Sequence, residues 1–458
     1  MFLDSLKKDQ KIHMIGIGGI SMSGLAEILI KWGYKVSGSD LTPSHITDKL
    51  QNSGVKVGIP HQANNVDDAD AVVYTAAVKA DNPEIIRAKE LHLPLVDRAT
   101  LLGEITGIYQ KTIAVSGTHG KTTTTSMIAA TLTEAGTDPT VLVGGELSSI
   151  GGNYRIGSSD FLVTEACEYV ESFLKFHPEC GIILNIEMDH LDFFKDIEHI
   201  KSSFSKFGNK VSPSGTVIGN FDDGNIIDIF KDIDRDKISF GITNPADWKA
   251  ENILFNARGC AGFSAYHNGS CIGDVQLSIP GRHNVYNALA CIAACSYYGI
   301  EFKKIRASLE RFTGAKRRFE YIGETNGIRI VDDYAHHPSE VKATLDAASK
   351  QNPNSLWCIF QPHTFTRTKS LLDEFATAFG AANHVIITDI YAARENNTGE
   401  IHSKDLVDAI NKETSNAVYA YSFEEAVKLI RGGAKFGDLV ITMGAGNIFK
   451  VGEMILEK

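Results

Sequence analysis

The segment SGTHGKT at residues 116–122 carries the strongest chemical signal in the sequence. It follows a short apolar run, Thr112–Val115, and the threonines after it lead into a predicted helix at Ser126–Ala135. Such a turn presents backbone N–H groups and the positive end of a helix, both of which bind phosphate. A lysine there is unfavourable unless an anion compensates it, and Lys121 and the Thr122 hydroxyl are placed to reach phosphates and Mg²⁺. We therefore predict phosphate contacts from Gly117, Thr118, His119, Gly120, Lys121, Thr122 and Thr123.

A second glycine-rich turn, IGIGGISMSG at residues 15–24, also joins an apolar strand pattern to a helical one. It is similar to the dinucleotide fingerprint GxGxxG, except that Ser21 stands at the third glycine position. Asp40 ends the next predicted strand, at about the spacing expected for an acid that binds ribose. We predict a site for a nucleotide diphosphate at Gly16, Gly18, Gly19, Ser21 and Asp40. The alternative is a tight turn without a ligand, and NAD has only weak support.

Strands that alternate with helical stretches must position these turns, and this alternation indicates parallel sheets in an α/β protein. Three strand–glycine–helix openings divide the chain, with boundaries expected near residues 107 and 314. We expect a Rossmann-like unit at 1–107, a P-loop ATPase-like α/β unit at 108–314 and a second Rossmann-like unit at 315–458. The segment Val285–Tyr298 is apolar all round, which is typical of a buried helix. Strands are predicted at His13–Gly19, Val36–Asp40, Ala71–Thr75, Thr112–Val115, Phe161–Thr164, Gly181–Asn185, Ile328–Val331, Leu356–Gln361, His384–Asp389 and Leu439–Met443.

Composition narrows the class of protein. A chain of 458 residues is long enough for about three domains. The net charge of -11 argues against a general nucleic-acid binder, which is usually basic. No apolar run is long enough to span a bilayer, and the first residues, with charges of both signs, do not form a secretory signal. The seven cysteines include no CxxC pair, which favours reduced thiols. We expect a cytoplasmic protein with neither a membrane nor a nucleic-acid partner.

Several motifs, in order along essentially the whole chain, resemble the Mur ligases, the family that builds the peptide of bacterial peptidoglycan. They are GIGGISMSG, GTHGKTTTT, EACEYVESFL followed by NIEMDH, GRHNVYNALA, RRFE, DDYAHHPSE, QPHTFTRT and GAGN. The general phosphate-loop pattern GxxxxGK[ST] would need a glycine at Val115, and the family's own variant of the loop accounts for its absence. The resemblance is strongest to the member that adds L-alanine to UDP-N-acetylmuramate. The chain departs from the family at Ser21, where glycine is common, and at EACEYV, which often reads EADESD.

The resemblance implies a ligase reaction for peptidoglycan precursor synthesis. ATP would phosphorylate the muramyl carboxylate to an acyl phosphate, which the amine of L-alanine would attack. The first glycine turn would bind the UDP-sugar. Lys121 would act on ATP, and Mg²⁺ would be held by Thr122, Glu165 and His190, whose segments match the family's metal-associated ones. Because cations must screen two approaching anions, Lys121, Glu165, His190 and Arg367 are the expected catalytic residues.

Further ATP contacts are expected from the second half of the chain. Asn284 and Asn287 lie three apart on one helix face, and an amide can read both donor and acceptor positions of adenine. A helix cap and a buried amide are the alternative for this pair. Arg317 and Arg318 precede the third unit; we assign Arg318 to the γ-phosphate, with a solvated basic linker as the alternative. By resemblance, Asp333 would contact the ribose or phosphates.

The amino-acid site is expected in the last unit. By resemblance, His336 and His337 would lie near it. Arg367 follows the next strand and suits the carboxylate of alanine, because arginine binds carboxylates bidentately. The alternative is that Arg367 binds phosphate or a neighbouring acid. Adjacent histidines can also indicate zinc, but no third ligand is apparent nearby in the sequence, so we do not favour zinc.

Three other functions compete with this interpretation. A related ligase attaches a recycled peptide to the same sugar nucleotide and shares every motif above. An NAD-dependent oxidoreductase would explain the first glycine turn but not GTHGKT. A non-catalytic nucleotide-binding regulator would not need Lys121, Glu165 and His190 together.

Overall fold

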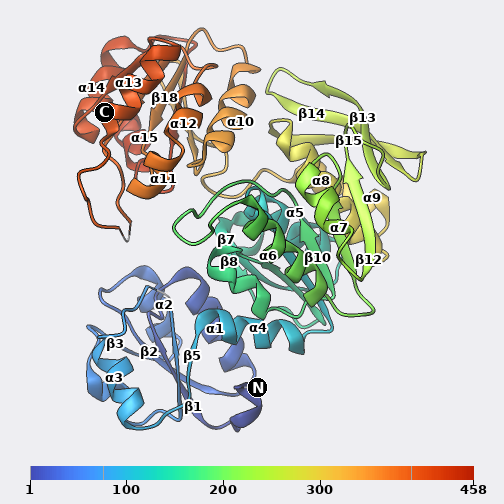
Figure 1. Ribbon diagram of the computed structural model, residues 1–458, viewed down its shortest axis with the longest axis vertical. Coiled ribbons are helices and arrows are strands. Elements are labelled where there is room, and N and C mark those ends of the chain that lie inside the picture. The colour runs from blue at the N-terminus through green and yellow to red at the C-terminus, as the bar shows by residue number, and fades with distance from the viewer. Residues whose placement is uncertain (1, 76, 394, 458) are drawn as a thin grey trace.

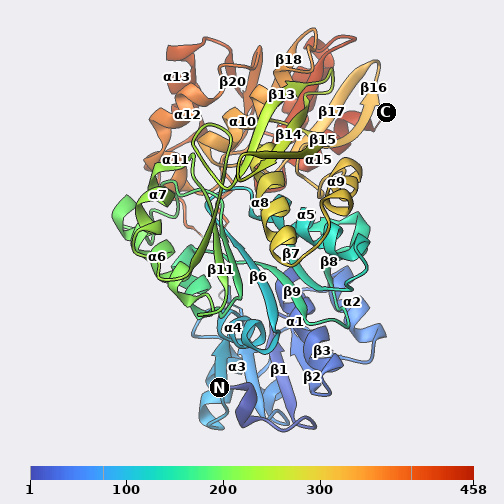
Figure 2. The same cartoon turned by 90° about the vertical axis from the view of Figure 1, so that its right-hand side faces the viewer.

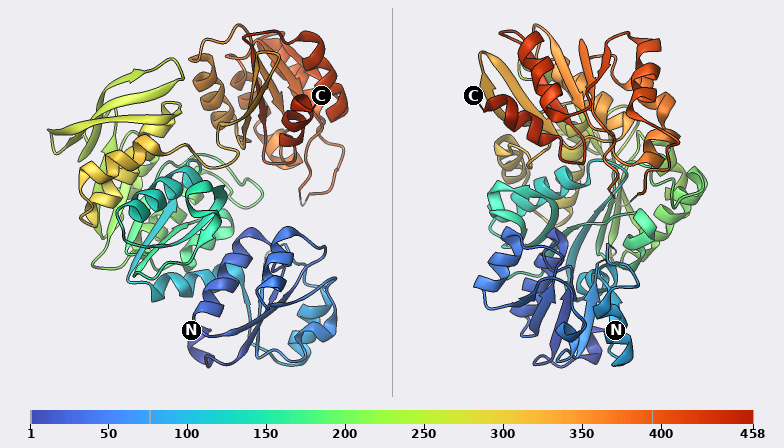
Figure 3. Two further views of the ribbon diagram at one scale, coloured as in Figure 1. Left: turned by 180° about the vertical axis from the view of Figure 1, so that it is seen from behind. Right: turned by 90° about the vertical axis from the view of Figure 1, so that its left-hand side faces the viewer.

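The computed structural model describes residues 2–75, 77–393 and 395–457. The chain forms three α/β units, each built on its own sheet, with the central unit between the other two (Figures 1 and 2). Seen from behind and from the other side, the N-terminal and C-terminal units again lie at opposite ends of the molecule (Figure 3). The predicted α/β class with parallel sheets is confirmed, whereas the boundaries near residues 107 and 314 stay predictions.

The N-terminal sheet is parallel throughout, in the order β3-β2-β1-β4-β5. Strand order reverses between β1 and β4, the kind of switch point at which Rossmann-like sheets bind ligands beyond their carboxyl ends. The first glycine turn follows β1 at this point. The elements are β1 Lys11–Ile15, α1 Ile20–Lys31, β2 Lys35–Ser39, α2 His45–Asn52, β3 Lys56–Gly58, β4 Ala71–Tyr74, α3 Pro83–Glu90, β5 Leu95–Asp97 and α4 Arg98–Ile108, with short 3-10 turns at Leu3–Ser5 and Ala63–Val66.

The central sheet has ten strands in the order β15-β14-β13-β12-β11-β10-β6-β9-β7-β8. Its middle, from β7 to β13, is parallel, and the pairs β13–β14, β14–β15 and β7–β8 are antiparallel. The elements are β6 Lys111–Ser116, α5 Lys121–Glu134, β7 Thr140–Leu147, β8 Gly152–Arg155, β9 Phe161–Glu165, β10 Cys180–Ile183, α6 Ile197–Lys210, β11 Thr216–Asn220, α7 Gly224–Phe230, β12 Asp236–Gly241, β13 Trp248–Phe255, β14 Cys260–His267, β15 Ser270–Pro280, α8 His283–Tyr297 and α9 Phe302–Arg311, with 3-10 turns at Ser148–Ile150 and Tyr169–Lys175.

Two helices of this unit position the phosphate loop. Helix α5 begins at Lys121, directly after the loop, although the apolar pattern alone predicts a helix only from Ser126. The four threonines at 122–125 are all buried in the core, and this tertiary packing outweighs their weak helix propensity. Helix α8, predicted as a buried helix, has a continuous run of buried residues from Asn287 to Cys295 and packs against α5.

The C-terminal sheet has the order β16-β17-β21-β18-β19-β20, parallel except for the β16–β17 pair. Its inner strands β18 and β21 are short, fully buried and mostly apolar runs, Leu356–Phe360 and Leu439–Met443. The elements are β16 Glu320–Thr325, β17 Ile328–Asp333, α10 Pro338–Ser349, β18 Leu356–Phe360, α11 Phe365–Ser370, α12 Leu372–Ala378, β19 His384–Ile387, α13 Ser403–Glu413, β20 Ala417–Tyr419, α14 Phe423–Gly433, β21 Leu439–Met443 and α15 Phe449–Leu456. Within the described ranges, none of the helices has the length and apolar character needed to cross a membrane.

Candidate active site

The phosphate loop is shaped by two glycines with left-handed backbone angles. Gly117 has φ +134° and Gly120 has φ +83°. A Cβ at Gly117 would lie 3.0 Å from the Cβ of Leu184, and one at Gly120 would lie 2.7 Å from Oδ1 of Asn287. Other residue types at these positions would be both strained and crowded. The loop therefore needs glycine at both positions to pack closely on the strand ends beside it.

Lys121 is buried in an ionic and hydrogen-bonded setting. Its Nζ donates to the carbonyl oxygens of Gly117 (2.5 Å) and Thr118 (3.1 Å) and to Oε2 of Glu168 (2.9 Å). Burial alone would lower the pKa of Lys121, but the Glu168 carboxylate raises it overall. The lysine is thus a fixed cation beside the loop, with a side chain only 16% exposed.

Glu168 forms the centre of a small charged group. Besides Lys121, its Oε1 lies 3.5 Å from Nε2 of His190, and its side chain is almost fully buried. Burial would raise the pKa of Glu168, but Lys121 lowers it overall, so the carboxylate is ionised. The structure therefore brings His190 to Lys121 through Glu168, a residue that the prediction did not include.

Glu165 ends β9, and its carboxylate also contributes to raising the pKa of Lys121. Its Oε1 accepts the backbone N–H of Gly144 at 2.6 Å. It lines a cavity of about 140 Å³ together with Ser21 and Asn153. This cavity lies between helix α1, which follows the first glycine turn, and strands β7 and β9. It extends from Ile20 and Ser21, in the first turn of α1, to Gly144 and Glu165.

The donors around the loop suit Mg²⁺. A Cβ on Gly145 would lie 3.0 Å from Cγ2 of Thr122, and a Cβ on Gly144 would lie 3.0 Å from Oε1 of Glu165, so both side chains flank the same short stretch of β7. Hydroxyl and carboxylate oxygens are the hard ligands that Mg²⁺ prefers, and an imidazole such as that of His190 is tolerated. The residue set therefore fits the ion.

The first glycine turn is closed by its own acid. The backbone N–H of Gly18 donates to Oδ2 of Asp40 at 2.9 Å, and Gly19 donates to the carbonyl of Gly16 at 3.1 Å. Asp40 follows β2, which ends at Ser39. The structure thus brings Asp40 to the turn, as the spacing indicated, and Ser21 lies in the exposed first turn of α1.

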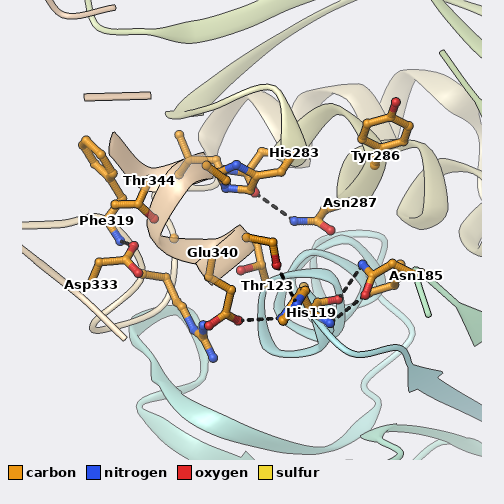
Figure 4. A pocket seen from close by; sticks show the side chains of 18 of the residues that line it. His119, Thr123, Asn185, His283, Tyr286, Asn287, Phe319, Asp333, Glu340 and Thr344 are labelled. Atoms are coloured by element: carbon orange, nitrogen blue, oxygen red, sulfur yellow. Dashed lines mark hydrogen bonds and ion pairs between the residues drawn. The ribbon is translucent and has the colours of Figure 1, made fainter. Parts of the chain in front are cut away.

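A cavity of about 200 Å³ lies where the central and C-terminal units meet (Figure 4). The phosphate loop, the start of α8 and the start of α10 surround it. Of the predicted ATP residues it brings together His119, Gly120, Thr123, Asn284, Asn287, Arg318 and Asp333. Sequence segments more than 200 residues apart therefore form one pocket.

The two asparagines of α8 are buried and bonded to each other. Nδ2 of Asn287 donates to Oδ1 of Asn284 at 2.9 Å, and Nδ2 of Asn284 donates to the carbonyl of Pro280 at 2.7 Å. Oδ1 of Asn287 accepts the hydroxyl of Thr124 at 3.2 Å. Both residues line the cavity, and Asn287 also supports the loop from behind.

The two adjacent arginines, Arg317 and Arg318, make different contacts. Arg317 binds within the C-terminal unit, to Asp332 (2.8 Å) and to the carbonyl of Gly444 (2.6 Å). Arg318 instead points across to the phosphate loop, with NH2 3.4 Å from Oγ1 of Thr122. Asp333 accepts two backbone N–H groups, and burial raises its pKa to about 6. Arg318, rather than Arg317, therefore faces the phosphate loop.

Arg367 is engaged by an acid from the central unit. Its guanidinium binds Asp189 with NH2–Oδ1 and NE–Oδ1 distances of 2.9 and 3.0 Å, and both side chains are about nine-tenths buried. NH1 also donates to the carbonyl of His363 at 3.3 Å. Burial would raise the pKa of Asp189, but Arg367 lowers it. The pairing matches the alternative of a neighbouring acid, so alanine binding at Arg367 would have to share or replace Asp189.

The histidine pair stands at the start of α10, close to Arg367. Nδ1 of His336 lies 3.0 Å from the carbonyl of Tyr334, and its ring is 5.8 Å from that of His363. Burial lowers the pKa of His336 to about 4, so the ring is neutral near physiological pH. His337 is the N-cap of α10, and its Nε2 lies 3.0 Å from the carbonyl of Met188. Both histidines therefore lie at the junction of the two units.

His119 joins the phosphate loop to α10. Its Nδ1 lies 3.0 Å from Oε1 of Glu340 and its Nε2 lies 3.4 Å from Oε2 of Glu187. Burial would lower the pKa of His119, but Glu340 and Glu187 raise it to about 10. The ring is therefore an imidazolium cation held between two carboxylates, and Figure 4 shows it pointing towards Glu340.

Sequence reasoning missed four acids of this site: Glu168, Glu187, Asp189 and Glu340. All four stand inside the motifs EACEYVESFL, NIEMDH and DDYAHHPSE. Because these motifs carry the predicted site residues, they also indicated that the four acids lie near the site. Their partners lie 47 to 221 positions away in the sequence, so the pairs follow only from the tertiary structure.

Three Mur ligase domain families match the chain in order. They are the Mur ligase family catalytic domain at residues 11–110, the Mur ligase middle domain at 115–295 and the Mur ligase glutamate ligase domain at 317–446.

The chain is also similar to individual proteins along its whole length. It is 55% identical to the UDP-N-acetylmuramate–L-alanine ligase of Acetivibrio thermocellus, over 98% of this chain and 96% of the relative. It is 50% identical to the enzyme of that name from Caldanaerobacter subterraneus, over 99% and 98%. Among solved structures it resembles the UDP-N-acetylmuramate–alanine ligase of Thermotoga maritima, with a TM-score of 0.82, 30% identity and 98% of both chains covered. The murein peptide ligase of Psychrobacter arcticus superposes with a TM-score of 0.72, at 29% identity and 98% coverage of both chains.

Proposed function

This chain belongs to the Mur ligase family, and on that basis we propose that it joins L-alanine to UDP-N-acetylmuramate at the expense of ATP, in the synthesis of peptidoglycan precursors. One observation carries the proposal: relatives named for this reaction are 55% and 50% identical over nearly the full length of both chains. The match covers 96% of the length of the first relative and 98% of the second. The alternative of a murein peptide ligase rests on a structural likeness at 29% identity.

The chemistry requires an activated carboxylate. A carboxylate is a poor acyl donor, so transfer of the γ-phosphoryl group of ATP to the muramyl carboxylate oxygen turns that oxygen into part of a leaving group. The amine of L-alanine then attacks the carbonyl carbon, forms the amide bond and releases inorganic phosphate. The first step brings two anions together, which a site with fixed positive charges makes possible.

Three groups of this chain supply positive charge where the phosphates would lie. The N-terminus of α5 and its backbone N–H groups face the loop opening. Lys121 is held charged beside them, and Arg318 reaches Thr122 from the C-terminal unit. For Lys121 to reach a phosphate, its Nζ must exchange the loop carbonyls for phosphate oxygens. Its contact with Glu168 keeps the side chain close to that position.

Mg²⁺ would be held by Thr122 and Glu165, with His190 nearby. When bound, the ion would supply charge neutralisation at the phosphates and at the acceptor carboxylate. Glu165 shares a cavity with Ser21 of the first glycine turn, so a UDP-sugar bound at Gly16, Gly18, Gly19, Ser21 and Asp40 can extend its carboxylate towards Glu165. ATP would then approach from the opposite side, with its base near Asn284 and Asn287 and its ribose near Asp333.

The amino-acid site is proposed at His336, His337 and Arg367. L-Alanine has little apolar surface, so its ends must carry recognition. A neutral His336 can accept a hydrogen bond from the amine, because burial keeps its pKa low and its ring uncharged. Arg367 can hold the carboxylate by sharing its guanidinium with Asp189. Arg367→Lys would keep the charge but lose the bidentate fork.

The charge, the cysteine pattern and the sugar-nucleotide substrate lead us to propose a cytoplasmic location. The chain would have no membrane or nucleic-acid partner.

The proposal is tested by the identity of the product. Incubation with ATP, Mg²⁺, UDP-N-acetylmuramate and L-alanine should yield UDP-N-acetylmuramoyl-L-alanine, identified by mass spectrometry. Glycine or L-serine should be used more slowly and D-alanine not at all. Arg367→Ala should raise the KM for alanine far more than the KM for ATP. Absence of the alanyl product with a folded, ATP-binding protein would refute the proposed function.

A further inference from the structure

Three side chains from different segments converge at the junction of the central and C-terminal units. His119 lies in the phosphate loop, Glu187 follows β10, and His337 caps α10. One ligand atom of each lies within 4.8 Å of the ligand atoms of the other two. Oε2 of Glu187 is 3.4 Å from Nε2 of His119 and 3.9 Å from Nδ1 of His337. Ligands at about 2.1 Å from a tetrahedral zinc ion stand about 3.4 Å apart, so the cluster is already close to that geometry.

The second nitrogen of each imidazole is held in the way that metal-binding histidines require. Nδ1 of His119 faces the Glu340 carboxylate at 3.0 Å, and Nε2 of His337 faces the Met188 carbonyl at 3.0 Å. Each of these nitrogens therefore carries the proton in the neutral ring. The lone pair on Nε2 of His119 faces the cluster, and the lone pair on Nδ1 of His337 faces both the cluster and the backbone N–H of Ser339 at 3.4 Å. A carboxylate or carbonyl behind each histidine fixes the tautomer and ring orientation of metal ligands.

Glu340 is itself fixed. Its Oε2 accepts the backbone N–H of His336 at 3.0 Å and that of His337 at 3.3 Å, at the start of α10. The group that orients His119 is therefore anchored on the same turn that carries His337.

The cluster needs a positive charge at its centre. Two carboxylates, Glu187 and Glu340, flank two imidazoles, and the Ser339 hydroxyl lies 3.0 Å from Nε2 of His119 and 2.8 Å from Nδ1 of His337. The single hydroxyl proton can be donated to only one of these nitrogens. Nδ1 of His337 also accepts the backbone N–H of Ser339 at 3.4 Å, so Nε2 of His119 is the nitrogen that depends on a proton of its own. In the metal-free protein, a proton on His119 supplies the charge. A divalent cation at this place would replace that proton and satisfy both nitrogens and the carboxylate together.

We propose that His119, Glu187 and His337 form a binding site for a divalent transition metal ion of the Zn²⁺ class. Two imidazoles and one carboxylate suit Zn²⁺ better than Mg²⁺, which prefers oxygen ligands. Glu187 has a side chain 42% exposed, which gives an ion a path from solvent, and the Ser339 hydroxyl or water can take the fourth position. The bound ion ties the phosphate loop to α10 and so holds the central and C-terminal units together. This site does not depend on the proposed ligase activity.

The test uses Co²⁺ as a spectroscopic probe on the full-length protein, after chelator treatment and in excess Mg²⁺. Tetrahedral Co²⁺ absorbs strongly in the visible range. We expect this absorption with one ion per chain and its loss when Zn²⁺ is added. Glu187→Gln and His337→Ala should abolish it, whereas His45→Ala, which changes an exposed histidine on α2, should not. Glu340→Gln should weaken Co²⁺ binding by about 10–100-fold, the usual effect of losing the group behind a ligating histidine.

Thermal melting provides a second readout and a check on folding. Zn²⁺ should raise the Tm of the wild type and of His45→Ala but not that of Glu187→Gln, an isosteric change at a partly exposed position that should fold normally. Absorption that persists in Glu187→Gln and His337→Ala would place the ion elsewhere, for instance on cysteines, and overturn the assignment. Absence of tetrahedral absorption in the wild type would overturn it equally.

Discussion

Lys121 is held by its own loop and by Glu168, so its removal has two separable effects. Lys121→Ala should reduce turnover by about 10²–10³-fold, as expected when one fixed charge at developing anions is lost. It also removes the cation paired with the buried Glu168 carboxylate, which then keeps only its contact with His190. Breaking such a buried pair costs about 3–5 kcal/mol of stability. If Lys121 were an exposed loop residue, its replacement by alanine would change the stability of the fold little.

A double variant separates the two effects. Lys121→Ala with Glu168→Gln should recover most of the lost stability in urea unfolding, because no buried charge is left alone, while turnover stays low. Turnover near that of the wild type in Lys121→Ala would show that the lysine does not act on phosphate.

The proposed Mg²⁺ ligands can be tested by titration. Glu165→Ala and His190→Ala should each raise the Mg²⁺ concentration needed for half-maximal activity, with little change in ATP binding, because both side chains flank the loop on the acceptor side. Glu146→Gln, an exposed acid on the same strand β7, is the matched control and should leave the titration unchanged. Unchanged Mg²⁺ curves for both alanine variants would exclude the ligand role.

At the scale of elements, α10 and the phosphate loop are joined by an ion pair whose strength depends on pH. The pKa of His119 rises from its ordinary 6.5 to about 10 because Glu340 and Glu187 flank the ring. A raised folded-state pKa stabilises the protein fully below about pH 6.5, and this contribution is lost as the pH rises through about 10.

Comparison with a neutral side chain isolates this contribution. In the presence of a chelator, the Tm of wild type should exceed that of His119→Gln at low pH, and the difference should shrink steadily between about pH 6.5 and 10. Most other titrating groups are common to both proteins, so their effects cancel. Glu187 and Glu340 differ, because His119 lowers their pKa values, but both titrate below this pH range. A Tm difference that is constant over this range would contradict the ion-pair assignment.

The sequence predicts elements well where periodicity and turn chemistry agree. The strands that precede both glycine turns, the buried helix α8 and the parallel strands of the third unit are all confirmed. The start of α5 was missed because four threonines read as poor helix formers, and only their burial against the core makes them helical. Local propensity cannot report such tertiary packing.

In the candidate site, too, local motifs predicted some residues, whereas contacts between distant segments could not be predicted. The sequence motifs pointed to Lys121, Asn287, Arg318 and Asp333. The structure places these residues in the phosphate loop or around the cavity beside it. The pairs Arg367–Asp189 and His119–Glu340 join residues 178 and 221 positions apart, which no local pattern can encode. The third ligand of the proposed zinc site is not apparent near His337 in the sequence for the same reason, since His119 and Glu187 belong to the central unit.

At the scale of the whole molecule, the two described cavities lie at the two junctions between units. Substrates held at both junctions should draw the units together and keep the acyl phosphate from water. Addition of ATP with UDP-N-acetylmuramate should therefore lower the radius of gyration in solution scattering. UDP-N-acetylglucosamine, which lacks the acceptor carboxylate, is the matched control and should compact the protein less. Identical profiles for the free and ternary states would contradict closure.

The central claim, that this Mur ligase adds L-alanine, is tested most directly by phosphate release from ATP in the presence of UDP-N-acetylmuramate. The assay compares no amino acid, L-alanine and the tripeptide L-alanyl-γ-D-glutamyl-meso-diaminopimelate, each alone and then in competition. We predict sustained phosphate release with L-alanine and none with the tripeptide alone. In competition, only the alanyl product should form. Preferential use of the tripeptide would contradict the claim and identify the chain as a peptide-attaching ligase.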